Sequence, residues 1–143
     1  MADITEHGGN MREIKFRGKS IDTREWVYGY YIKSGPDYHG GERHSIATPG
    51  TVADYAGLKF IQVDPKTVGQ FIGIPDKNGR EIYEGDSVYI DCSKECSRDV
   101  EGIVKYEFGS FNVDEEEINY SFGDIPDEIY VTGNIHENPE LLS

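Results

Sequence analysis

Short stretches of alternating apolar and polar residues run through most of the chain. A period of two residues is typical of β-strands with one buried face. The alternation predicts strands at 12–17, 26–32, 59–63, 67–74, 80–83, 87–90, 102–108, 111–113 and 129–135.

Turn residues separate these predicted strands. In Asp76-Lys77-Asn78-Gly79, the Asn-Gly pair favours a hairpin closed by a type I′ turn. Residues 34–50, rich in Gly, Pro, Ser and His, predict a loop. Thr51-Val52-Ala53-Asp54 has the form of a helix-capping box, but Gly57 limits any helix to one or two turns. We therefore expect a mainly β fold, an antiparallel barrel or sandwich-like domain of short strands with at most one or two short helices.

A length of 143 residues suits one domain. Residues 1–10 carry no periodic pattern, and we expect a disordered N-terminal extension there, followed by a single domain over 11–143. The first residues lack the basic and apolar segments of a signal peptide, and no stretch has the roughly 18–20 apolar residues of a membrane span. The expectation is a cytoplasmic protein without a membrane partner.

Charge is distributed unevenly along the chain, whose net charge is −13. Residues 1–80 hold 11 Lys/Arg against 10 Asp/Glu, whereas residues 81–143 hold 3 against 17. An acidic surface repels phosphate backbones, because nucleic-acid binding depends on Lys and Arg that replace counterions. Nucleic acid is therefore a disfavoured partner, and a protein partner is favoured.

Two stretches are candidates for an interaction surface. Trp26, Tyr28 and Tyr30 alternate along one predicted strand, so they share a face, and aromatic residues dominate both protein cores and subunit interfaces. Asp114-Glu115-Glu116-Glu117 places four carboxylates together, which is typical of a solvated loop and could also dock a basic partner.

The sequence predicts no catalytic centre, no cofactor site and no metal site. Cys92 and Cys96 have a C-x₃-C spacing, but structural zinc normally takes four N or S ligands, and a second paired motif is absent from the sequence. His136-Glu137 could supply a general base only with a positioned partner and a substrate pocket. Capping or packing of the C-terminal segment is the favoured interpretation, and the P-loop, nucleophile-elbow and H-E-x-x-H patterns are absent.

Several phrases together resemble the YopX family of phage and prophage proteins. They are the opening at 11–19, the central signature at 67–73 and 76–86, and the ending at 133–142. The stretches 91–100 and 114–117 depart from the family pattern and have the character of variable loops.

The resemblance implies a phage or prophage origin, a small β-rich fold and self-association, and it supplies no catalytic residues. We therefore expect a non-catalytic accessory protein in the bacterial cytoplasm that contacts a second copy of itself, a phage protein or a host protein. Two alternatives stay open: an acidic mimic of nucleic acid that inhibits a basic host protein, and a small metal-dependent hydrolase or nuclease.

Overall fold

The computed structural model describes residues 13–36, 38, 40–50, 57–91, 99–107, 109–115, 118–121 and 128–138. These residues form two antiparallel sheets of six and five strands and one short 3₁₀ helix, η2, at Pro65–Thr67. The mainly β, sandwich-like fold class expected from the alternation is confirmed.

The first sheet has the strand order β4-β3-β2-β1-β5-β6. Its strands are β1 (Phe16–Lys19), β2 (Trp26–Ser34), β3 (Arg43–Pro49), β4 (Leu58–Gln62), β5 (Gly69–Pro75) and β6 (Glu81–Tyr83). The second sheet has the order β10-β9-β8-β7-β11. Its strands are β7 (Asp86–Ile90), β8 (Val100–Glu107), β9 (Ser110–Glu115), β10 (Ile118–Ser121) and β11 (Ile129–Asn134).

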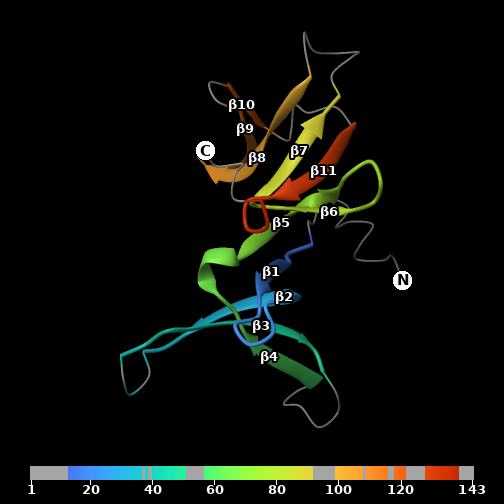
Figure 1. The fold of residues 1–143 in the computed structure, drawn as a ribbon. Helices are drawn as coiled ribbons and strands as arrows, with labels where there is room; N and C mark the ends of the chain where they lie inside the picture. The colour runs from blue at the N-terminus through green and yellow to red at the C-terminus, as the bar shows by residue number, and fades with distance from the viewer. Residues whose placement is uncertain are drawn as a thin grey trace, which may run out of the picture.

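A single hydrophobic cluster joins the second sheet to the β5–β6 end of the first. Its buried members are Ile72, Ile82, Val88, Ile90, Val100, Val104, Phe111, Val113 and Ile129. Strands β2, β3 and β4 contribute no residue to this cluster, and Figure 1 shows them extending away from the second sheet. We call these three strands the β2–β4 arm.

β2 divides its pairing between two neighbours. Its first half pairs with β1, up to Phe16↔Gly29, and its second half pairs with β3, starting at Tyr30↔Ala47. Gly29 lies at the change of partner, where a Cβ atom would meet the Ala47 carbonyl oxygen at 2.1 Å. A side chain at this position is therefore excluded by the close approach of the two backbones.

The sequence missed two strands. Residues 34–50 were expected to form a loop, yet Arg43–Pro49 forms β3, between β2 and β4. Only Ile46 and Ala47 of β3 are buried, so the strand has too few apolar positions to show alternation. β10 at Ile118–Ser121 was also not predicted. The capping-box segment 51–54 and the expected extension 1–10 lie outside the described residues.

The hairpin predicted at Asp76–Gly79 forms and connects β5 to β6. Its predicted turn type is wrong: Gly79 has φ +84°, but Asn78 does not have a positive φ, as a type I′ turn requires. The Gly79 N–H donates to the Asp76 carbonyl, and the Asp76 N–H donates to the Arg80 carbonyl. Asp76 Oδ1 also accepts from the N–H groups of Asn78 and Arg80, which stabilises the wider turn.

Candidate functional site

Arg17 on β1 forms a buried junction between the two sheets. Its Nη2 lies 2.8 Å from Asp86 Oδ1 at the start of β7, and the two side chains are only 5% and 1% exposed. The guanidinium carbon lies 4.5 Å from the Trp26 ring centroid and 4.9 Å from that of Tyr83. A cation between two aromatic faces is attracted to both.

Asp86 is held from a second direction. Its Oδ2 accepts a hydrogen bond of 2.8 Å from the Tyr83 N–H, which closes the turn between β6 and β7. Burial raises the pKa of the Asp86 carboxyl, although the Arg17 charge opposes that shift. A carboxylate this deeply buried depends on its cation, so Arg17 and Asp86 act as one structural unit.

The C-terminal turn 135–138 also contacts the Trp26 side chain. The indole Nε1 donates to Glu137 Oε1 at 2.8 Å, and the His136 ring packs edge-on at a centroid distance of 5.7 Å. Buried Asn134 fixes the turn, because its Oδ1 accepts from the N–H groups of His136 and Glu137. The interpretation of His136-Glu137 as packing and capping groups is therefore supported by the contacts that they make.

Ionisation follows from the same contacts. The hydrogen bond from Trp26 lowers the pKa of Glu137, with help from Asn134 and Lys19. Partial burial lowers the pKa of His136, and the Arg17 and Lys19 charges act in the same direction. His136 is therefore neutral at pH 7, and Glu137 is ionised.

The aromatic candidates on β2 differ in exposure along the strand. Trp26 is partly covered by the junction, Tyr28 is 44% exposed with its ring 5.7 Å from that of Tyr83, and Tyr30 is 62% exposed. Ile32, two positions further, is 37% exposed on the same face. The apolar face thus opens toward solvent away from the junction.

Phe60 of β4 extends this face and was missed by the sequence reasoning. The register Tyr30↔Ala47↔Phe60 places the three residues in one row across β2, β3 and β4. Phe60 is 49% exposed, whereas Ala47 between the two rings is 1% exposed. Directly paired residues share a sheet face, so Tyr28, Tyr30, Ile32 and Phe60 form one surface, which we call the aromatic face.

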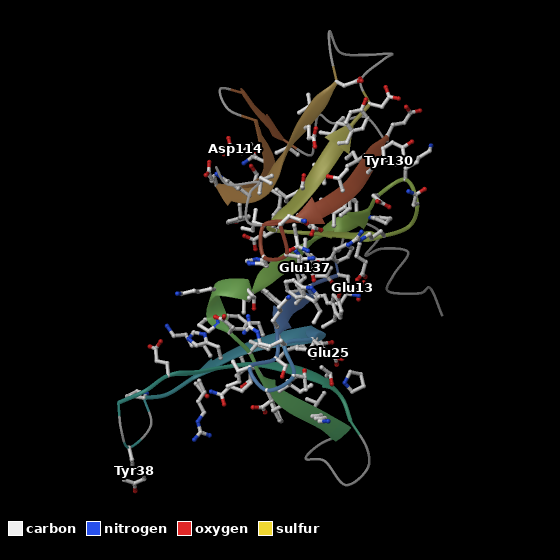
Figure 2. All side chains as sticks on the ribbon, viewed as in Figure 1. Glu13, Glu25, Tyr38, Asp114, Tyr130 and Glu137 are labelled. Atoms are coloured by element: carbon white, nitrogen blue, oxygen red, sulfur yellow. The ribbon has the colours of Figure 1, made fainter. Side chains whose placement is uncertain are left out.

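The acidic candidates lie elsewhere. Figure 2 shows Asp114 on the second sheet, far from the β2–β3 connection that carries Tyr38. Asp114 Oδ2 lies 2.6 Å from Lys105 Nζ of the neighbouring strand β8, and this hydrogen bond raises the pKa of Lys105. Glu115 belongs to β9, while Glu116 and Glu117 lie outside the described residues. The two predicted parts of the interaction surface are therefore not brought together.

Neither a metal site nor a membrane-spanning helix is found in the described part of the chain. Within it, no group of three or more His, Cys, Asp or Glu side chains is placed to hold a metal ion. Cys92 and Cys96 fall outside it, so the zinc alternative stays open. Its helical content includes no segment long and apolar enough to span a bilayer.

Comparisons with known proteins give a family match and a similar solved structure. The family described as YopX protein matches residues 15–143. The chain belongs to the YopX family. A search of curated proteins finds no match. Among solved structures, protein EF1440 from Enterococcus faecalis is similar, with a TM-score of 0.50 and 26% identity over 92% of this chain and 99% of that one.

The sequence segments that resemble the YopX family contain the residues of the junction. The opening contains Arg17, the central signature contains Asp76 and Asp86, and the ending contains Asn134 and the turn against Trp26. Asp76 Oδ2 accepts from the Val131 N–H of β11, which ties the hairpin to the second sheet. In this chain, the family phrases therefore hold the two sheets together.

Proposed function

We propose that this YopX protein is a phage-type, non-catalytic accessory protein that works through protein–protein contacts and associates with a second copy of itself through the aromatic face. One observation carries the proposal. Four of the nine exposed large apolar side chains among the described residues, Tyr28, Tyr30, Ile32 and Phe60, lie on this one face. Contiguous exposed apolar surface of this kind marks interaction sites.

Charge favours a second copy as the occupant. Residues 26–62, which include the β2–β4 arm, hold three Lys/Arg and three Asp/Glu, so the region is neutral. The 81–143 half carries most of the negative charge and repels its own copy. Two chains can therefore approach most easily arm to arm, with their acidic halves apart, in an isologous pair.

The face is a better contact than the strand edge beside it. β4 is an edge strand of the first sheet, but it is only five residues long and carries Lys59. Short edges with a lysine disfavour edge-to-edge pairing. When two such sheet faces pack together, their aromatic side chains bury the apolar area that a stable interface needs.

Sedimentation equilibrium of matched variants tests the proposal. Tyr30→Ser with Phe60→Ser should weaken self-association at least about 100-fold, since each aromatic anchor contributes roughly 2 kcal/mol or more. Tyr38→Ser is the control, because Tyr38 is fully exposed in the β2–β3 connection and lies outside the aromatic face. A wild-type protein that stays monomeric at high concentration contradicts the proposal, as does equal weakening in the control.

The acidic mimic of nucleic acid is the second candidate, and the excess of 17 Asp/Glu over 3 Lys/Arg in residues 81–143 favours it. Such an inhibitor binds a basic protein through opposite charges, so salt should weaken the complex. Capture of purified DNA-binding proteins at two salt concentrations tests this. Capture that does not change with salt counts against mimicry.

A further inference from the structure

A cleft of about 410 Å³ lies beside the junction, on the side of β1 and β6. It is lined by Lys15, Arg17, Tyr28, Arg80, Glu81 and Tyr83. The volume falls in the range of small-molecule sites, which span about 300–1,000 Å³. Neither the family match nor the proposed role of the aromatic face implies a ligand for this cleft.

The cleft concentrates positive charge in a strongly acidic protein. Three of its six lining residues are cationic, against the single carboxylate of Glu81. Glu81 is already engaged, because Oε2 accepts from Lys15 Nζ at 2.5 Å and Oε1 accepts from the Tyr83 hydroxyl at 2.9 Å. Arg17 is likewise paired with Asp86 behind the cleft, so Arg80 is the lining cation that has no ion pair among the described residues.

Two of the cations have unused donors. Arg17 is 4% exposed, and its Nε is buried without a hydrogen-bond acceptor. Arg80 is exposed at the rim, and its guanidinium makes no ion pair with the acidic side chains in the described part of the chain. A buried donor without an acceptor is costly, so a bound anion that reached it would relieve the cost.

Tyrosine rings supply the rest of the wall. Tyr28 lies directly opposite Arg17 in the β1–β2 register, and its ring is partly exposed beside the buried ring of Tyr83. An apolar aromatic surface next to guanidinium groups suits a ligand with an anionic group and a flat body.

We propose that this cleft binds a small organic anion, with its negative group between Arg17, Arg80 and Lys15 and its planar body against Tyr28. Phenyl phosphate is the probe, since it combines a dianion with one ring. Inorganic phosphate and phenol provide each half alone.

Binding is measured by NMR titration of the Tyr30→Ser, Phe60→Ser variant, which leaves every lining residue of the cleft intact. This background separates ligand binding from self-association, so either proposal can fail without the other. We expect saturable shifts of cleft resonances with phenyl phosphate, and affinities at least about tenfold weaker for inorganic phosphate and for phenol.

Arg80→Gln tests the charged half of the site, and it should weaken phenyl phosphate binding about tenfold. Arg43→Gln is the matched control, because it makes the same charge change at an exposed position on β3, outside the cleft. Binding unaffected by Arg80→Gln, equal losses in both variants, or phenol binding as tight as phenyl phosphate would each overturn the proposal. The absence of any saturable shift in the millimolar range would also overturn it.

Discussion

The second sheet buries its apolar side chains in a core, whereas the β2–β4 arm exposes several of its own. In the second sheet and the β5–β6 hairpin, apolar residues converge on one cluster, and seven of its nine members are at most 3% exposed, including Ile82 and Val88 at 0%. On the arm, Tyr30 and Phe60 stand in register on a sheet that has no layer over that face among the described residues. Apolar alternation alone therefore indicates a sheet face, and the packing partner decides whether that face is core or interface.

The junction adds side-chain contacts with the second sheet to the backbone pairing by which β1 holds the arm. Arg17 and Trp26 lie on β1 and β2. Their partners Asp86 and Glu137 lie at the same end of the β7–β11 pair, where Asp86 is paired with Asn134. Breaking the junction should therefore lower the free energy of unfolding, whereas changing the aromatic face should mainly weaken association.

The largest effect is expected for Asp86→Ala. Removing one partner of a buried ion pair leaves Arg17 charged and uncompensated, so the free energy of unfolding should fall by about 3–5 kcal/mol. Urea unfolding measures this change. Glu101→Ala, which removes an exposed carboxylate on β8, is the control and should lie within about 0.5 kcal/mol of wild type. A loss below about 1 kcal/mol for Asp86→Ala would show that the junction is not structural.

An alanine substitution in the core should lower the free energy of unfolding more than one on the aromatic face. Ile82→Ala removes a fully buried side chain and should lower the free energy of unfolding by about 2–5 kcal/mol. Phe60→Ala should lower it by less than about 1 kcal/mol, because the ring is half exposed. Both are measured at a protein concentration at which the chain is monomeric, since association itself stabilises the fold. Equal losses would place Phe60 in the core of the monomer.

A smaller effect is expected when Glu137 is protonated. Trp26, which donates a hydrogen bond to Glu137, is the only tryptophan in the chain, so its fluorescence reports on this contact. The lowered pKa means that Glu137 contributes stability above its unfolded pKa near 4.5, and this contribution is lost as pH falls through the folded-state pKa. Trp26 fluorescence should therefore change with a midpoint below pH 4.5. Glu137→Gln should abolish this step, and a step of unchanged size in the variant would contradict the assignment.

Sequence reasoning was most successful where alternation and turn chemistry agree. It located β2, β7 and the β5–β6 hairpin, because those segments combine apolar alternation with clear flanking turns. It missed β3, which is stabilised by pairing on both sides and carries few apolar residues. The turn type predicted at Asp76–Gly79 was wrong. The Asn-Gly pair alone does not reveal that the Asp76 side chain accepts hydrogen bonds from two backbone N–H groups.

The candidate site was only partly accessible from sequence. Tyr28 and Tyr30 were placed correctly on one face, but their continuation to Phe60 depends on the register through β3, the strand that was missed. Trp26 was grouped with them, yet the junction covers it, since Arg17 and Glu137 come from segments far apart in the chain. Long-range contacts of this kind leave no local pattern.

The response of self-association to salt tests the central claim most directly. If two copies meet through their neutral arms while their acidic halves repel, screening removes the repulsion and leaves the apolar contact. Sedimentation equilibrium of the wild type at about 50 mM and about 500 mM salt, which spans the range over which the Debye length shortens severalfold, should show tighter association at the higher salt. A dimer that dissociates as salt is raised would show that opposite charges, and not the aromatic face, hold the copies together.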